Sequence, residues 1–348
     1  MSGPRPWHEC PLRLLAVVHG VLTDIDDTLT HDGAIEAPAL AALHALRAAG
    51  VAVIAITGRP MGWSEPFARD WPVDAIVAEN GAVALFRDAD ALAIEYAQDA
   101  ATRERNAARL RAAATRILRN VPGATLARDS AGRVTDIAVD HAEHARLDER
   151  QVEAVLRAMH EEGMTASVSS IHVNGWYGSH DKLSGARWIV RRRCGRDLDA
   201  ERSRGLYVGD STNDQAMFAH FPLSVGVANL LDFADRLDTW PAYLTQGARG
   251  AGFAEVAARL LEARRRAGHQ ARRCHRSPSC LAHVVLLARC AASGRRPDLA
   301  SGATPVRARY AAPGGASSAI RGRPAWRRAS SSRAATSAKP APRAPCVR

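Results

Sequence analysis

The segment that most restricts the fold of this chain runs from residue 37 to residue 57. "APALAALHALRAAG" (37–50) repeats apolar residues at helical spacing and ends at a glycine, which is typical of a helix end. "VAVIAIT" (51–57) is rich in β-branched residues and continuously apolar, as in a strand buried on both faces. An earlier apolar run, "LLAVVHGVLT", ends at Thr23 and is also typical of a strand. Strand, helix and strand in this order predict a right-handed βαβ unit, and therefore a parallel sheet.

The same alternation returns in the second half of the chain. "KLSGARWIVRRRCG" predicts a helix from Lys182, and "GLYVGD" (205–210) predicts a buried strand. A helix from Asn213, a strand at 223–229 and a last helix that ends near residue 266 follow. We therefore predict an α/β fold with a Rossmann-like parallel sheet core and helices on both faces.

Between these two halves the pattern changes. Residues 83–98 and 124–140 favour strands, the second pair hinged at the turn-forming "DSAGR", and 165–178 is again strand-like. Residues 100–120 and 148–163 predict amphipathic helices. This is the pattern of an inserted α+β domain. The predicted organisation is a core at 12–83 plus 180–266, an inserted α+β cap at 84–179 and a disordered basic tail at 267–348.

The charge of the chain is unevenly distributed. The formal net charge is +11, but residues 264–348 hold 19 Lys and Arg against one acid, so this part carries +18 and the preceding part carries −7. The tail is rich in Pro, Ser and Arg and has few periodic apolar faces, which predicts disorder. Two interpretations stay open: a basic arm for nucleic acid or anionic lipid, and adventitious coding sequence with no function of its own.

Several acidic residues follow directly after predicted strands. Asp24 and Asp26 come after the first strand, and Asp210 and Asp214 come after the strand at 205–210. In a parallel sheet these strand ends share one edge, so the four carboxylates converge there. Carboxylates that converge repel one another, and Mg²⁺, a hard cation that prefers oxygen ligands, would offset that repulsion.

The same edge offers groups that bind phosphate. Thr57 follows the strand at 51–57, and Lys182 begins a helix of the core. A hydroxyl, an ammonium group and nearby backbone N–H groups are suitable donors to phosphate oxygens. Together with the carboxylates and the metal they meet the needs of phosphoryl transfer.

Four ordered motifs carry a resemblance to a known family. "DIDDT" (24–28), "TGR" (57–59), Lys182 and "GDSTND" (209–214) resemble the motifs of the haloacid dehalogenase superfamily of phosphohydrolases. The inserted domain resembles the type-IIB cap. "GRPMGWSE", "ENGA" and "SVGVANL" are similar to the sugar-phosphate phosphatases of that branch, such as sucrose-phosphate and trehalose-phosphate phosphatases.

The resemblance implies a role for each motif residue. Asp24 would attack phosphorus and become an aspartyl-phosphate, while Asp26 would protonate the leaving alcohol and then activate water. Asp27 has no chemical role in this pattern and is expected to turn away. The implied phosphate-binding residues are Thr57, Gly58, Lys182 and Asn213, and the implied Mg²⁺ ligands are Asp24, Asp26 (through its backbone carbonyl), Asp210 and Asp214, the last as a ligand or as a partner of one.

Substrate specificity is expected from the cap and from the core loops that face it. Aromatic rings and amides suit a sugar, which stacks on the one and hydrogen-bonds to the other. Trp176 could equally belong to the core of the cap. The residues predicted to contribute are Arg59, Glu79, Asn80, Asn174 and Trp176.

The predicted function is a Mg²⁺-dependent phosphatase that hydrolyses a small phosphomonoester, with a sugar phosphate as the favoured substrate. The alternatives are a phosphosugar mutase of the same superfamily and, with less support, a nucleic-acid-binding protein that acts through its tail. A receiver-type signalling domain also combines acids, Thr and Lys, but it lacks the second Asp of the first motif and an inserted cap. Only Cys10 and Cys194 precede the tail, and no segment has the ~20 apolar residues of a membrane span, so the predicted location is the cytoplasm. The sequence does not fix the oligomeric state.

Overall fold

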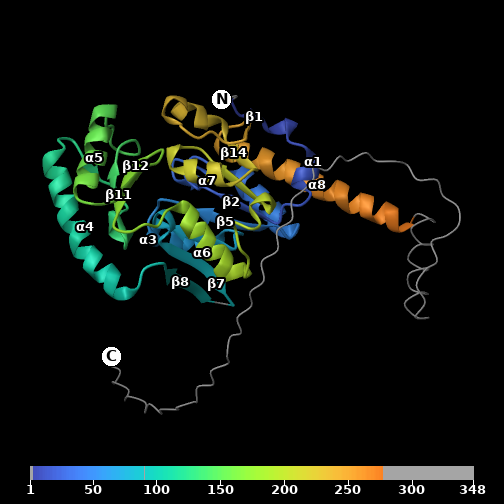
Figure 1. The fold of residues 1–348 in the computed structure, drawn as a ribbon, viewed down its shortest axis with the longest axis horizontal. Helices are drawn as coiled ribbons and strands as arrows, with labels where there is room; N and C mark the ends of the chain where they lie inside the picture. The colour runs from blue at the N-terminus through green and yellow to red at the C-terminus, as the bar shows by residue number, and fades with distance from the viewer. Residues whose placement is uncertain (1–2, 90, 277–348) are drawn as a thin grey trace, which may run out of the picture. The chain divides into compact units, whose positions relative to one another are not determined.

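The computed structural model describes residues 3–89 and 91–276, with side chains described up to residue 269 (Figure 1). Most of the predicted disordered tail therefore lies outside the described residues. Its first part is described and is helical, because the last helix continues to Arg276 and does not end near residue 266. None of the helices in the described ranges is long and apolar enough to cross a membrane.

The larger sheet of the described residues has nine strands in the order β1-β15-β14-β13-β2-β5-β6-β7-β8. The strands from β1 to β6 in this order are parallel, and β7 and β8 add an antiparallel edge. The strand bounds are β1 Arg5–Pro6, β2 Gly20–Thr23, β5 Ala52–Ile56, β6 Ala75–Ala78, β7 Val83–Asp88, β8 Ala91–Tyr96, β13 Gly205–Gly209, β14 Ser224–Gly226 and β15 Tyr243–Leu244.

Both faces of this sheet are covered by helices. Alternate strand residues point to opposite faces, so Val21 joins one buried apolar cluster and Leu22 the other. Helices α1, α2, α3 and α8 contribute to the first cluster, and α6 and α7 to the second. The predicted α/β class is confirmed. The helix bounds are α1 Leu12–Leu15, α2 Ala37–Ala48, α3 Met61–Asp70, α6 Lys182–Cys194, α7 Gln215–His220 and α8 Arg249–Arg276.

The first predicted strand is shorter in the structure than the apolar run suggests. Only Gly20–Thr23 forms β2, and Leu12–Leu15 forms the short helix α1 after Pro11. Leu15 and Val18 are fully buried in the cluster that α8 covers. The apolar residues of this run are therefore explained by packing against a helix as well as by the sheet, which a continuous hydrophobic pattern cannot distinguish.

A smaller antiparallel sheet has the order β11-β12-β10-β9 and packs against α4 and α5. In Figure 1 these two helices lie beside β11 and β12, on the green part of the chain. Asp99 and Asp148 cap the helices by accepting backbone N–H groups of the first turn. The bounds are α4 Ala100–Asn120, β9 Thr125–Leu126, β10 Asp136–Asp140, α5 Glu149–Glu161, β11 Thr165–Val168 and β12 His172–Trp176; a separate hairpin pairs β3 (Thr30–His31) with β4 (Ala34–Ile35).

One strand pair differs from the predicted organisation. The sequence assigns residues from 84 onward to the cap, but β7 and β8 belong to the larger sheet. Residues Val83–Phe86 are buried on both faces, so β7 extends the core and does not begin a new one. The elements of the smaller sheet and its helices begin at Ala100. The division into core and inserted cap remains a prediction, with its first boundary moved to about this residue.

Candidate active site

The parallel register brings the predicted site residues to one edge of the larger sheet. β2 lies between β13 and β5, so Thr23 pairs with Val208 on one side and with Ala55 on the other. Asp24 follows β2, and its backbone N–H donates to the Val208 carbonyl at 2.9 Å. Residues far apart in the sequence therefore meet at the carboxyl ends of three adjacent strands.

Three carboxylates form a buried cluster there, which we call the carboxylate cluster: Asp24, Asp210 and Asp214. Ligand oxygens of the three lie within 4.8 Å of one another, and all three side chains are buried. Lys182 is also buried, and its Nζ lies 2.8 Å from Asp24 Oδ2 and 2.7 Å from Asp214 Oδ1. Burial lowers the pKa of Lys182, but the Asp214 and Asp24 carboxylates raise it by more, so this side chain is a cation.

Two close backbone approaches place Lys182. It is the first residue of α6, which Asp181 caps by accepting the Ser184 N–H at 2.6 Å. A Cβ atom on Gly185 would lie 2.5 Å from the Gly81 Cα, so only glycine lets α6 approach the short helix η2 (Glu79–Gly81) after β6. The start of α6 is thereby held over the sheet edge.

Asp214 acts as a brace for the other groups of the cluster. Its Oδ1 accepts from Lys182 and from the Tyr207 hydroxyl at 2.5 Å. Its Oδ2 accepts the backbone N–H groups of Asp210 at 2.9 Å and Ser211 at 3.3 Å. Because both oxygens are already used, Asp214 fits the role of partner to a metal ligand better than that of ligand.

Asp210 is the unsatisfied member of the cluster. Its Oδ1 accepts from the Thr28 hydroxyl at 3.2 Å, but its buried Oδ2 has no hydrogen-bond partner among the described residues. Burial and the neighbouring charges of Asp24 and Asp214 raise the pKa of Asp210 well above its usual value. A buried carboxylate oxygen without a donor is costly unless a cation meets it. Asp24 and Asp210 therefore fit a hard divalent cation such as Mg²⁺.

Asp24 itself is a desolvated carboxylate beside a cation. Its Oδ1 accepts the Ile25 N–H at 2.7 Å, and its Oδ2 faces Lys182. Burial raises the pKa of Asp24 to about 7, although the charge of Lys182 opposes this shift. A cation placed next to Asp24 would favour its ionised form.

The second aspartate of the first motif faces a different set of partners. Asp26 Oδ1 accepts from Arg59 Nε at 2.8 Å, and its Oδ2 accepts from the Thr57 hydroxyl at 3.3 Å. The Thr57 hydroxyl oxygen in turn accepts the backbone N–H of Arg59 at 2.9 Å. The structure thus brings together Thr57 and Asp26, and on the other side Asn213, whose Oδ1 accepts from Lys182 at 3.1 Å.

Arg59 also contacts carboxylates that follow strands of the smaller sheet. Its Nη2 lies 2.8 Å from Glu143 Oε1 and its Nη1 lies 3.2 Å from Asp129 Oδ2. His172 Nε2 lies 2.9 Å from Glu143 Oε2. Burial opposes the ionisation of Glu143, but hydrogen bonds from His172 and Arg59 lower its pKa to about 2. The sequence prediction missed Glu143 and Asp129, since they lie in connecting segments that match no motif.

A polar cavity of about 210 Å³ adjoins these groups. Asp26, Arg59 and Glu143 line it, together with Asp27 and Arg249. The Asp27 Oδ1 accepts from Arg249 Nε at 2.8 Å. Asp27 therefore does turn away from the carboxylate cluster, as expected, but it turns into the cavity. The cavity also has Thr30, Asp32, Gly33, Ala142, Arg146, Ser170 and Ile171 in its lining.

Of the five predicted specificity residues, only Arg59 lines this cavity. The buried Glu79 carboxylate accepts the Thr135 N–H at 2.6 Å, and the Asn174 amide donates to the Gly58 carbonyl at 3.2 Å. The Trp176 indole N–H donates to the His180 carbonyl at 2.9 Å. Asn80 is buried, and its Nδ2 has no partner in the described part of the chain. A specificity role for these four residues stays a prediction, and their contacts are those of internal packing.

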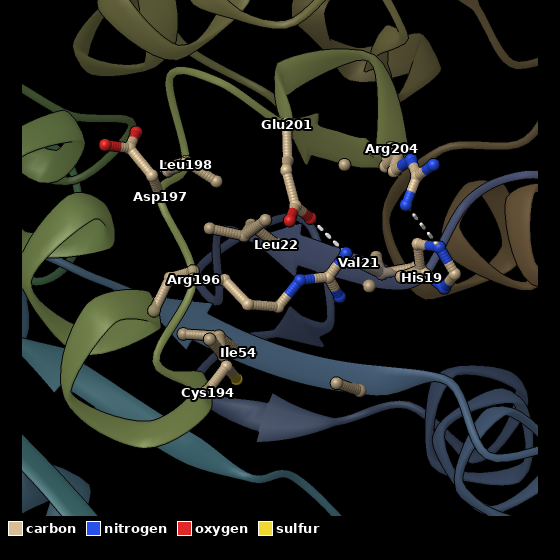
Figure 2. A pocket seen from close by; sticks show the side chains of 14 residues that line it. His19, Val21, Leu22, Ile54, Cys194, Arg196, Asp197, Leu198, Glu201 and Arg204 are labelled. Carbon is tan, nitrogen blue, oxygen red and sulfur yellow. Dashed lines mark hydrogen bonds and ion pairs between the residues drawn. The ribbon is translucent and has the colours of Figure 1, made fainter.

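A different cavity, of about 60 Å³, lies at the opposite ends of the strands (Figure 2). His19, Ala52 and Gly205, at the amino ends of β2, β5 and β13, are part of its lining. Arg196 pairs with Glu201 across it, as Figure 2 shows. The cavity shares no residue with the carboxylate cluster, and its small volume and mainly apolar lining do not suit a phosphorylated substrate.

Residues 21–105 match the family model of the haloacid dehalogenase-like hydrolases. A search of curated proteins finds no sequence that matches the chain. Three similar solved structures illustrate the fold. They are Thermoplasma acidophilum 0175 (17% identity, 70% of this chain and 98% of that one, TM-score 0.54), the C-terminal domain of C. albicans trehalose-6-phosphate phosphatase (14%, 74% and 98%, 0.54) and the sucrose-phosphatase of Synechocystis sp. PCC6803 (17%, 69% and 97%, 0.51). The predicted resemblance to the haloacid dehalogenase-like hydrolases is confirmed.

Proposed function

On the premise that this chain is a haloacid dehalogenase-like hydrolase, we propose that it is a Mg²⁺-dependent phosphatase that forms an aspartyl-phosphate intermediate. The observation that carries the proposal is the buried carboxylate cluster, in which Asp24 faces Lys182 and Asp210 keeps one oxygen without a donor. Such a site combines a nucleophile, a fixed positive charge and an acceptor for a cation.

Asp24 is the proposed nucleophile. One of its carboxylate oxygens forms a bond to phosphorus while the bond from phosphorus to the alcohol oxygen breaks, which yields an aspartyl-phosphate and an alkoxide. Lys182, 2.8 Å from Asp24, stabilises the negative charge of the transferring group, and the Thr57 hydroxyl, the Gly58 N–H and Asn213 assist it.

Asp26 is the proposed proton carrier. It gives its proton to the departing alkoxide, and it then takes a proton from the water that attacks the aspartyl-phosphate. The second step releases inorganic phosphate and restores the Asp24 carboxylate. Arg59 and Thr57 hold the Asp26 carboxylate in position through its two oxygens.

Asp24, Asp210 and the backbone carbonyl of Asp26 would hold Mg²⁺, with Asp214 as the brace. When bound, the ion supplies positive charge that compensates the carboxylates and the phosphate oxygens. Burial around the cluster excludes water, so these charges act with little screening.

The proposed substrate is a small phosphomonoester, with a sugar phosphate as the favoured class. Support comes from the polar cavity beside Asp26 and from the names of two structural neighbours, which are sugar-phosphate phosphatases. A cytoplasmic location stays a prediction from the cysteine content.

The function is tested with a panel of phosphorylated metabolites, with Mg²⁺ or with a chelator. The wild type should release phosphate only with Mg²⁺, and Asp24→Asn should lose at least about 10³-fold in kcat because the nucleophile is gone. Asp235→Asn is the matched control, since Asp235 is exposed and distant in the fold from the cluster. Turnover by Asp24→Asn at the wild-type rate would overturn the mechanism.

A further inference from the structure

The cavity beside Asp26 carries an inference about the chemical class of the substrate, and this inference rests on the proposed function. We infer that the cavity binds the alcohol part of the phosphomonoester, and that this alcohol is uncharged and polyhydroxylated. Phosphate esters whose alcohol carries a second phosphate or a carboxylate are then poor substrates.

The position of the cavity assigns it to the leaving group. Asp26, the proposed proton donor to the leaving oxygen, is part of its lining, whereas Asp24 and Lys182 are not. Its volume of about 210 Å³ is below the ~300–1,000 Å³ of pockets that hold drug-sized ligands. A small alcohol is therefore the fitting occupant.

The cationic groups of the lining are already neutralised. Arg59 is 4% exposed and is paired with Asp26 at 2.8 Å and with Glu143 at 2.8 Å. Arg249 is paired with Asp27 at 2.8 Å. Neither guanidinium group can take a second anion as partner without losing a carboxylate that it already holds.

The remaining charges of the lining do not change this balance. Arg146 is exposed and donates to the Ala142 carbonyl, and no described carboxylate forms an ion pair with it. Asp32, with its side chain 94% exposed, offsets this charge. The complete lining holds four carboxylates (Asp26, Asp27, Asp32 and Glu143) and three guanidinium groups (Arg59, Arg146 and Arg249), so it has no surplus of positive charge.

Hydroxyl groups meet this lining without breaking a pair. A carboxylate that is paired with arginine keeps free lone pairs, and a hydroxyl can donate to it and accept from a neighbouring guanidinium N–H. Ser170 adds a hydroxyl of its own to the lining. Several donors and acceptors of both charges within one small cavity suit an alcohol with several hydroxyl groups.

The test uses phosphomonoesters in matched sets on the wild-type full-length chain with Mg²⁺. One set is glucose 1-phosphate, glucuronic acid 1-phosphate and glucose 1,6-bisphosphate, which differ only at carbon 6. Another is fructose 6-phosphate with fructose 1,6-bisphosphate. We expect kcat/KM for the best uncharged alcohol to exceed that of every anionic counterpart by at least about tenfold, since anionic groups face paired carboxylates.

A charge variant sharpens this test. Glu143→Gln removes one carboxylate partner of Arg59, so it should shift the kcat/KM ratio toward the anionic substrates by at least about fivefold. The matched control is Glu162→Gln, which removes the carboxylate of a Glu–Arg pair, with Arg116, that does not line the cavity. The control should leave the ratio at the wild-type value.

The outcomes separate the two proposals. Phosphate release that is greatest for a bisphosphate or a phosphorylated acid overturns the inference and leaves the phosphatase proposal intact. A ratio that Glu143→Gln does not move, or that Glu162→Gln moves equally, overturns the role of the paired charges. No turnover of any phosphomonoester overturns the proposed function, and this inference with it.

Discussion

The carboxylate cluster and the cavity beside Asp26 treat their charges in opposite ways. In the cluster, one buried lysine serves carboxylates from three positions, and Asp210 keeps an oxygen without a donor. In the cavity, Arg59 and Arg249 are each matched to carboxylates. A surplus of buried negative charge calls for a cation, whereas a balanced lining calls for a neutral ligand. The difference separates the place of chemistry from the place of recognition.

The largest effect is expected from removing the single cation of the cluster. Lys182→Met leaves Asp24 and Asp214 buried without their shared partner, so we expect a loss of about 3–5 kcal/mol in the free energy of unfolding. Turnover should also disappear. Chemical denaturation and phosphate release measure the two effects. An equally stable, active variant would contradict the charge assignment of the cluster.

The next effect tests the unsatisfied oxygen of Asp210. Mg²⁺ that binds only the folded chain should raise its stability by about 2.7 kcal/mol at a concentration 100 times the Kd. Asp210→Asn should abolish this increase, and the exposed Asp235→Asn should retain it. Thermal unfolding with and without Mg²⁺ gives the answer, and an increase that survives Asp210→Asn would place the ion elsewhere.

A smaller effect is expected where the larger sheet meets the segment before β10. Glu79 accepts the backbone N–H groups of Met61 and Thr135, and also the Thr135 hydroxyl. Glu79→Gln turns one acceptor into a donor that faces other donors, so we expect a loss of about 1–3 kcal/mol in unfolding free energy. Urea denaturation measures it. Unchanged stability would mean that these contacts do not hold the loop.

The smallest effect concerns the paired charge of Glu143. Its pKa is lowered to about 2 in the folded chain, so its contribution to stability is present above its ordinary pKa and is lost as the pH falls toward 2. The unfolding free energy of the wild type should therefore fall more between pH 4.5 and pH 2 than that of Glu143→Gln. Parallel pH profiles for the two proteins would show that the pairing is weak.

The sequence predicted the cluster better than the cavity, and the reason is physical. Asp24, Thr57 and Asp210 lie where parallel strands end, so strand prediction alone brings them to one edge. Glu143 and Arg249 reach the cavity through connections whose paths no local pattern determines. The same limit explains why Glu79 and Asn174 were predicted to recognise substrate: a polar residue on a loop can equally satisfy buried backbone groups.

Local packing also decided the errors in the fold. A continuous apolar run before Asp24 fits a long strand and fits a short helix followed by a short strand, and only the burial of Leu15 beneath α8 selects the second. β7 is apolar on both faces, which signals a core strand, but its antiparallel direction conceals it in a pattern of parallel βα units.

The central claim is that the carboxylate cluster performs a double displacement through Asp24. The stereochemical course at phosphorus tests it most directly, with a substrate whose phosphate is chiral through oxygen isotopes. Two successive in-line displacements, first by Asp24 and then by water, predict net retention of configuration. Net inversion would show that water attacks the substrate directly, and would contradict the account.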